Sequence, residues 1–203
     1  MKEDGENFLV VPSTDVEPFK GVLKNGVRRW SPYRSKLAAL AKKTGGFDGL
    51  LPTNRALYLG AGNGYTVSFL ADLCKECHIY AVECSHTSSR DLLKVARHRK
   101  NIHPLIANAR MASSYMTTVP TPDWLFQDIS QRDQVEIFLS HLPFLQSRSV
   151  AILILKVESL SKGHSINRAL DAAADALSLH CVVKETVSLE PYEKMHGALI
   201  CTR

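Results

Sequence analysis

The stretch that decides the fold runs from Arg55 to Glu83 and reads RALYLGAGNGYTVSFLADLCKECHIYAVE. A short apolar run at 56–59 leads into a glycine-rich turn, GAGNG, at 60–64. Helical spacing follows over 66–73, and a second apolar run at 79–82 ends on the acid Glu83. This is the order of a nucleotide-binding βαβ unit, in which glycines let the backbone approach a ligand and a carboxylate grips ribose hydroxyls. The stretch predicts a site for an adenosine-bearing ligand.

The spacing of the glycines narrows the kind of ligand. The loop reads G-x-G-x-G, whereas a turn that holds the pyrophosphate of a dinucleotide has the spacing G-x-G-x-x-G. No constellation for hydride transfer accompanies it. A nicotinamide-dependent dehydrogenase is therefore disfavoured.

Composition bounds the class of protein. A chain of 203 residues, 45% of them apolar, suits one domain with a small appendage. No apolar run approaches the ~20 residues of a membrane span, and the start, MKEDGENF, does not resemble a secretory signal. The five cysteines are odd in number and lack the spacing of a disulfide framework, which favours a reducing compartment. The net charge of +5 is compatible with a polyanionic partner such as RNA.

Helical and strand patterns alternate through the rest of the chain. Residues 1–30 predict a short N-terminal segment, partly irregular, with candidate strands at 8–11 and 21–23. The alternation from residue 31 onward predicts an α/β fold with a seven-stranded, mainly parallel sheet, Rossmann-like, whose last strand is antiparallel. Beyond the glycine-loop unit, helices are expected at 87–100, 132–142 and 169–179, and strands at 105–107, 123–126, 150–155, 181–189 and 198–201.

A helix is also expected just before the glycine-loop unit. Ser31 is a candidate cap, with Pro32 as the first helical residue. Leu37, Leu40 and Ala41 give an apolar stripe at helical spacing, which would put Lys36 in the second turn. Trp30 lies just upstream. We expect it to anchor the packing of the core, in preference to stacking on a nucleobase.

Polar residues follow the predicted strands where a ligand site is expected. In an open α/β sheet, ligands bind beyond the carboxyl ends of the strands, and those ends carry Glu83, Asn108, Asp128 and Lys156 besides the glycine loop. A lysine that leaves a buried strand can lose its proton, and a neighbouring acid can hold it in place. The alternative is a salt bridge at the strand ends without chemistry. Cys74 and its CxxC partner lack the further ligands of a zinc site, so no metal is expected.

Several stretches, taken together and in order, resemble the fibrillarin family of RNA ribose 2′-O-methyltransferases. They are RRWSPYRSKLAAL, LYLGAGNGYTVS, YAVECSHTSSRDLL, NIHPLIANAR, FQDISQRDQ, ILKVESL and LEPYEKMHGAL, which span most of the chain from Arg29. The resemblance implies a class I methyltransferase fold over 31–203 that uses S-adenosylmethionine. By motif, the cofactor site would comprise Gly60, Ala61, Gly62, Gly64, Tyr65, Thr66, Glu83, Cys84, Asn108, Ala109, Asp128 and Gln131.

The resemblance also implies a catalytic set of Lys36, Asp128, Lys156 and His196. Lys156 would be the base that takes the proton of a ribose 2′-hydroxyl, with its pKa lowered by burial and by the nearby sulfonium. Asp128 would orient Lys156, and Lys36 and His196 would position the ribose. No metal is implied.

Partners and location follow from the same resemblance. It implies rRNA or tRNA as substrate, selected by a guide RNA in a box C/D particle, with a scaffold protein of the Nop5 or Nop56/58 type and an L7Ae-type protein. No Gly/Arg-rich tail is present, which favours an archaeal cytoplasm over a nucleolus. The glycine loop GAGNGYT and Asn108, where the family usually has aspartate, depart from the family pattern. They motivate an alternative: a non-catalytic scaffold subunit of a ribonucleoprotein.

Overall fold

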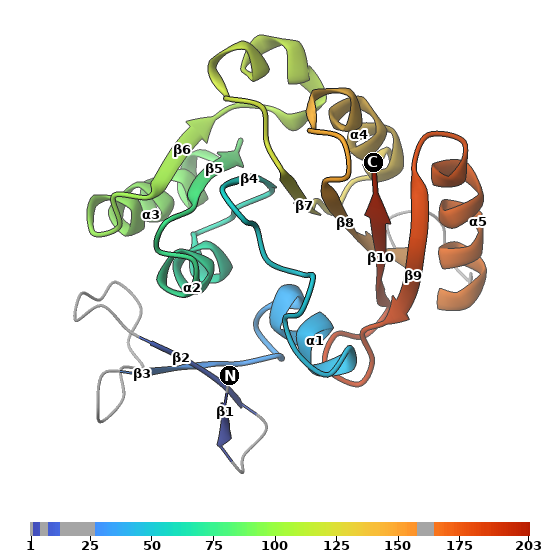
Figure 1. The fold of residues 1–203 in the computed structure, drawn as a ribbon, viewed down its shortest axis with the longest axis horizontal. Helices are drawn as coiled ribbons and strands as arrows, with labels where there is room; N and C mark the ends of the chain where they lie inside the picture. The colour runs from blue at the N-terminus through green and yellow to red at the C-terminus, as the bar shows by residue number, and fades with distance from the viewer. Residues whose placement is uncertain (1, 5–7, 13–26, 158–164) are drawn as a thin grey trace.

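The computed structural model describes residues 2–4, 8–12, 27–157 and 165–203. Its centre is a seven-stranded sheet with the order β6-β5-β4-β7-β8-β10-β9 (Figure 1). The strands are β4 (Arg55–Leu59), β5 (His78–Glu83), β6 (Ile102–Ile106), β7 (Trp124–Asp128), β8 (Val150–Lys156), β9 (Val182–Ser188) and β10 (His196–Thr202). β10 runs antiparallel to both of its neighbours, β8 and β9, and the other pairings in this sheet are parallel, so the predicted fold class is confirmed.

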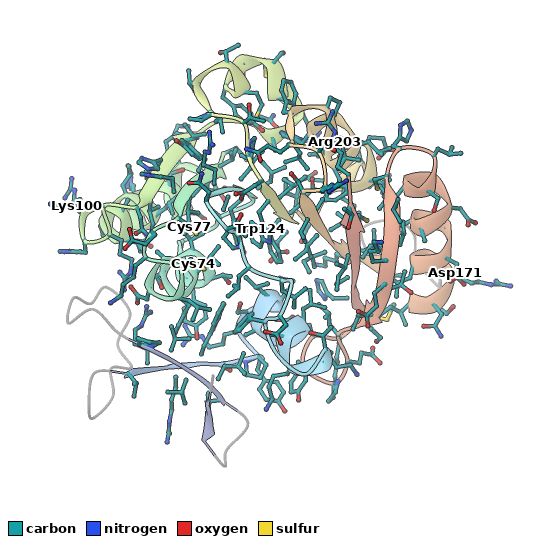
Figure 2. The ribbon with its side chains drawn as sticks, viewed as in Figure 1. Cys74, Cys77, Lys100, Trp124, Asp171 and Arg203 are labelled. Atoms are coloured by element: carbon teal, nitrogen blue, oxygen red, sulfur yellow. The ribbon has the colours of Figure 1, made fainter. Side chains whose placement is uncertain are left out.

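Helices cover both faces of the sheet because its central strands are apolar on both sides. One face packs against α1 (Lys36–Lys43), α2 (Tyr65–Leu73) and α3 (His86–Arg97). The other packs against α4 (Gln134–His141), α5 (Ile166–Ser178) and the short 3₁₀ helices η1 (Ala109–Ser114), η2 (Met116–Thr118) and η3 (Leu142–Phe144). Figure 2 shows Trp124 near the centre of the molecule and Lys100 and Asp171 at opposite edges.

A second sheet precedes the first. Strands β1 (Lys2–Asp4), β2 (Phe8–Pro12) and β3 (Val27–Trp30) pair antiparallel, and β2 lies next to α2 (Figure 1). Trp30 is fully buried and stacks on Phe47 and Phe69, which confirms its role as a packing anchor. The candidate strand at 8–11 is confirmed, whereas the one at 21–23 lies outside the described residues.

The start of α1 differs from the prediction. Ser31 caps a turn instead of a helix, because its hydroxyl and carbonyl oxygens accept hydrogen bonds from the amides of Tyr33 and Arg34. The true N-cap is Ser35, whose hydroxyl accepts from Ala38 N at 3.4 Å. Lys36 is therefore the first residue of the helix, and its side chain reaches Asp128 at the carboxyl end of β7.

Two other helices are shorter than the sequence patterns indicate. The helix expected at 87–100 ends at Arg97, and the one expected at 132–142 begins at Gln134. Among the described residues, no helix is long and apolar enough to cross a membrane.

Candidate functional site

The glycine loop brings β4 close to the end of β7. Gly60 has φ +79°, and a Cβ atom built on it would lie 2.2 Å from the carbonyl oxygen of Asp128. Only glycine fits such a backbone approach. Gly64, with φ +84°, is the left-handed N-cap of α2, and its Cα packs toward Leu92 and Val95 of α3. The loop is therefore held between two helices and the strand that carries Asp128.

The Glu83 side chain binds the glycine loop and the start of α3. Its Oε2 accepts a hydrogen bond from Gly62 N at 2.7 Å, and its Oε1 accepts one from Ser85 N at 2.7 Å. The carboxylate thus fixes the glycine loop and the start of α3 together. A carboxylate offers about four acceptor positions, so two remain beside these two hydrogen bonds.

A pocket of about 270 Å³ opens beyond the carboxyl ends of β4, β5, β6 and β7. This is close to the lower limit of ~300 Å³ for small-molecule sites. Eight of the twelve residues predicted for the cofactor line it: Gly60, Gly62, Glu83, Cys84, Asn108, Ala109, Asp128 and Gln131.

Four predicted cofactor residues lie outside the pocket lining. Ala61 is buried and Gly64 caps α2. The Tyr65 ring packs edge-on against Phe69, and Thr66 Oγ1 lies 3.0 Å from Ser35 Oγ. These four residues hold the loop and its neighbouring helices in place.

Sequence reasoning missed six residues of the pocket. Five of them directly flank predicted positions, so the strand ends were the available signal; Ile137, on α4, comes from a helix face that the sequence pattern does not assign to the site. The missed residues are Val82, Ala107, Arg110, Ile129, Ser130 and Ile137.

Asn108 and Arg110 form one polar wall of the pocket. The Asn108 side-chain oxygen accepts from Arg110 N at 3.0 Å, which leaves the amide nitrogen as a donor. The Arg110 guanidinium makes an ion pair with Asp133 and donates to Gln131 at 3.0 Å. This pair raises the pKa of Arg110 and lowers the pKa of Asp133. The asparagine therefore keeps a hydrogen-bonding role at this wall.

The lining has the chemistry of an adenosine site. Val82, Ala107 and Ile129 give it apolar walls, and Glu83 and the Asn108 amide supply hydrogen-bonding groups. The glycines allow a ligand to lie against the backbone. The residues present therefore fit the adenosine part of S-adenosylmethionine.

Next to this pocket, Lys36 and Asp128 form an ion pair. Lys36 Nζ lies 3.0 Å from Asp128 Oδ2, and the side chains are only 21% and 22% exposed. Burial lowers the pKa of the Lys36 ammonium and the Asp128 carboxylate raises it, with a net pKa above the usual value for lysine. Lys36 therefore stays protonated and can hold a ligand oxygen.

Lys156 and His196 face each other at the ends of neighbouring strands. They are register partners in the β8–β10 pairing, and both are partly exposed. His196 Nδ1 donates to the carbonyl oxygen of Lys194 at 2.7 Å. With Nδ1 as the donor, the neutral tautomer has its acceptor at Nε2. The register places the Lys156 and His196 side chains next to each other on one face of the sheet.

The partner of Asp128 differs from the expectation. We expected Asp128 to orient Lys156, but its ion pair is with Lys36. The β7–β8 register explains this, because Asp128 is opposite Ile154 and Lys156 lies two residues farther along, about 6.6 Å at the usual rise of a strand. No ion pair joins Lys156 to Asp128 among the residues that the structure describes.

The CxxC cysteines do not line the pocket: Cys74 is the C-cap of α2, and Cys77 follows three residues later. Cys77 Sγ donates to the carbonyl oxygen of Pro52, and burial raises the pKa of Cys74 to about 12. Both thiols are thus protonated packing groups. In the described part of the chain, no three His, Cys, Asp or Glu side chains are grouped to hold a metal ion.

Comparisons with known proteins agree with this geometry. A family profile described as Fibrillarin matches residues 12–203. The fibrillarin-like rRNA/tRNA 2′-O-methyltransferase of Methanoculleus marisnigri is 40% identical over 179 residues, which cover 88% of each chain. A solved fibrillarin/Nop5p complex contains a chain with a TM-score of 0.89 and 30% identity, covering 97% of both chains.

A further solved structure, Aeropyrum pernix fibrillarin with natively bound S-adenosyl-L-methionine, has a TM-score of 0.77 and 30% identity. It covers 94% of this chain and 85% of that one. The sheet order and the pocket at its strand ends define the class of S-adenosylmethionine-dependent methyltransferases. Within that class, the chain belongs to the fibrillarin family.

Proposed function

We propose that this protein methylates the 2′-hydroxyl of ribose in rRNA or tRNA, with S-adenosylmethionine as the methyl donor. One observation carries the proposal: Asp128, paired with Lys36 of α1, and Lys156, the register partner of His196 at the start of β10, lie at the carboxyl ends of the adjacent strands β7 and β8, and Asp128 also lines the cofactor pocket. A hydroxyl nucleophile needs a base and an orienting cation beside the methyl donor, and this rim offers both.

The four side chains divide the work on the ribose. Lys156 accepts the proton of the 2′-hydroxyl while the oxygen forms its bond to the methyl carbon. Lys36 stays charged beside Asp128 and donates to a ribose oxygen. His196 Nε2 accepts from a neighbouring hydroxyl. When bound, the cofactor supplies an electrophilic methyl group and leaves as the neutral thioether.

Glu83 and Asn108 fit the cofactor side of the site. The free acceptor positions of Glu83 suit the ribose hydroxyls of S-adenosylmethionine, and the Asn108 amide suits the adenine edge. The substitution of asparagine for the usual aspartate motivated a non-catalytic scaffold as the alternative. The complete set of Lys36, Asp128 and the Lys156–His196 pair favours the enzyme.

Recognition of RNA would be delegated to partners. The net charge of +5 suits a polyanion, and the similar fibrillarin was solved with Nop5p. We propose a box C/D assembly with a guide RNA, a scaffold protein of the Nop5 type and an L7Ae-type protein, acting in an archaeal cytoplasm. Co-purification of the protein with its RNA, followed by sequencing, tests this assembly.

The test of the mechanism replaces Lys156 by methionine. Lys156→Met keeps the length of the side chain and removes the base, so methyl transfer should fall by about 10²- to 10⁴-fold. Binding of S-adenosylmethionine, measured by calorimetry, should stay within about twofold, because Lys156 is not in the pocket lining. Normal turnover in this variant would rule out the proposed mechanism.

A further inference from the structure

Lys156, at the end of β8, extends past the last residue of the neighbouring strand β7. Pairing of β7 with β8 ends where Asp128 faces Ile154. Backbone groups of alternate residues point to the same edge of a strand. Val157 N donates toward β10, to Met195 O at 3.0 Å. The N–H and C=O of Lys156 therefore point to the opposite edge, where β7 has ended.

The side chain of Gln134 takes the place of the missing strand. Its Oε1 accepts from Lys156 N at 2.9 Å, and its Nε2 donates to Lys156 O at 3.1 Å. One amide group therefore satisfies both backbone groups of one residue. Gln134 is fully buried, so water cannot replace it at this position.

Gln134 is itself held by β7. It is the first residue of α4, and its carbonyl oxygen accepts from Gln127 Nε2 at 2.6 Å. Gln127 is also fully buried and directly precedes Asp128. Two glutamine side chains thus link the strand of Asp128, the start of α4 and the backbone of Lys156.

We infer that Gln134 is a positioning residue for methyl transfer, because its amide fixes the backbone of Lys156 relative to the Lys36–Asp128 pair. The inference rests on the proposed function of Lys156. Gln134 does not line the cofactor pocket, so it acts on the base and not on the cofactor. Misplacement of a reacting group by about 1 Å can cost about 10²-fold in rate, and an unpaired strand end permits a shift of that size.

The first test variant is Gln134→Met, which keeps the approximate volume and removes both hydrogen bonds. We expect the single-turnover rate to fall by about 10- to 100-fold. The dissociation constant for S-adenosylmethionine should stay within about twofold. The assay uses the full chain in a particle assembled with scaffold protein, guide RNA and a synthetic target RNA.

Asn101→Leu is the matched control. The Asn101 side-chain amide also bridges backbone groups, donating to Ala71 O at 3.1 Å and Cys74 O at 3.2 Å. It lies directly before β6, at the end of that strand opposite the pocket. We expect a lower melting temperature and an unchanged transfer rate. An unchanged rate in Gln134→Met, or a loss no larger than that in Asn101→Leu, would overturn the inference.

Gln134→Glu decides the matter should Gln134→Met fail to fold. A carboxyl group buried against a carbonyl oxygen is held protonated, so it accepts from Lys156 N and donates to Lys156 O, as glutamine does. Its transfer rate should be near that of the unaltered protein at neutral pH and fall at higher pH, as the carboxyl ionises. A pH profile parallel to that of the unaltered protein would overturn the inference.

Lys156→Met in the same assay distinguishes the proposed role of Lys156 as the base from the positioning role of Gln134. Normal turnover in Lys156→Met would refute the proposed function of Lys156. An inactive Lys156→Met with a fully active Gln134→Met would refute only the positioning role of Gln134.

Discussion

A single residue, Gly60, decides how closely the glycine loop approaches the end of β7. Gly60 and the carbonyl oxygen of Asp128 are in direct contact, at a backbone conformation that disfavours any side chain. One glycine thereby allows the loop after β4 to lie against Asp128 at the end of β7. This contact could be anticipated from the sequence only as a general requirement of the glycine turn.

Gly60→Ala should weaken both stability and cofactor binding. The positive φ alone costs ~1 to 3 kcal/mol for alanine, and relief of the contact with Asp128 O moves the loop away from β7. We expect a lower urea midpoint and at least about tenfold weaker binding of S-adenosylmethionine, since 1.4 kcal/mol corresponds to tenfold. Gly45→Ala is the control, because that glycine also has a positive φ but an open Cβ position, and it does not line the pocket.

The Lys36–Asp128 pair should make stability depend on alkaline pH. The pKa of Lys36 is higher in the folded protein than its usual value, so the unfolded chain loses this proton first. The stabilisation is complete below about pH 10.4 and is lost as pH rises through the folded pKa. The difference in free energy of unfolding between the unaltered protein and Asp128→Asn should shrink from pH 9 to 11.5; a constant difference would contradict the ion pair.

The sequence was sufficient to place Glu83, Asn108, Asp128 and Lys156 at strand ends. It was not sufficient to pair them. Asp128 binds Lys36 because the N-cap of α1 is Ser35, four residues later than the cap expected at Ser31. Helix starts and the residue where a strand pairing ends depend on tertiary contacts, and a single sequence shows neither.

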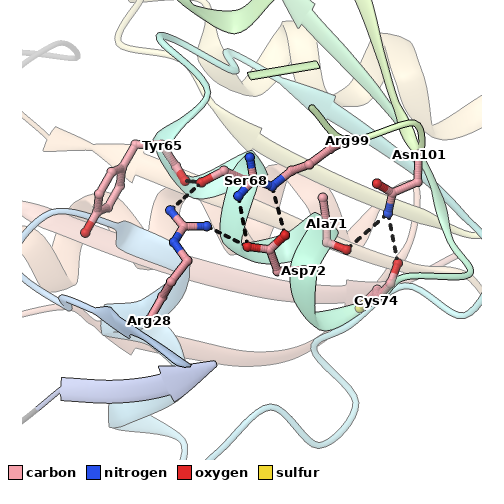
Figure 3. A network of polar contacts seen from close by, with 8 residues as sticks. All are labelled: Arg28, Tyr65, Ser68, Ala71, Asp72, Cys74, Arg99 and Asn101. Carbon is pink, nitrogen blue, oxygen red and sulfur yellow. Dashed lines mark hydrogen bonds and ion pairs between the residues drawn. The ribbon is translucent and has the colours of Figure 1, made fainter. Parts of the chain in front are cut away.

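At the scale of the elements, a buried charge network joins β3, α2 and the segment after α3 (Figure 3). The Asp72 carboxylate on α2 forms ion pairs with Arg28 Nη1 at 2.7 Å and with Arg99 Nε at 2.8 Å. Arg28 also donates to Ser68 and lies over the Phe69 ring. All three charged side chains are at most 5% exposed, so the network connects the N-terminal sheet to the main domain.

Asp72→Ala should be among the most destabilising substitutions in the chain. It would leave two buried guanidinium groups without their carboxylate, a change that typically costs ~3 to 5 kcal/mol. Equilibrium unfolding in urea measures the loss. Asp91→Ala, which breaks the exposed pair with Lys94, should cost less than ~1 kcal/mol. Equal losses in the two variants would contradict a buried network.

The other face of the sheet contains a buried histidine, His141, at the end of α4. Burial lowers the pKa of its imidazole, and the ring meets the hydroxyl of Tyr115 and the carbonyl of Ile137. The unfolded chain binds this proton first, so stability should fall as pH falls below about 6.5. His141→Gln should flatten the loss of unfolding free energy between pH 7 and 5; an unaltered slope would contradict the assignment.

At the scale of the whole molecule, the small sheet and the large sheet share one apolar cluster. Leu9, Val11 and Trp30 belong to the same buried cluster as Leu37 of α1 and Phe69 of α2. The order and class of the main elements followed from periodicity and turn residues, because these signals are local. The division of the chain into segments at 1–30 and 31–203 stays a prediction. The sequence could not show the contacts between these two segments, because they join residues far apart in the chain.

The atom that receives the methyl group defines the proposed reaction. The most direct measurement is nuclease digestion and mass spectrometry of target RNA after reaction with the assembled particle and isotope-labelled S-adenosylmethionine. The account predicts label only in a 2′-O-methylnucleoside, at one position set by the guide RNA, and none with Lys156→Met. Label on a nucleobase, or transfer that persists in Lys156→Met, would contradict it.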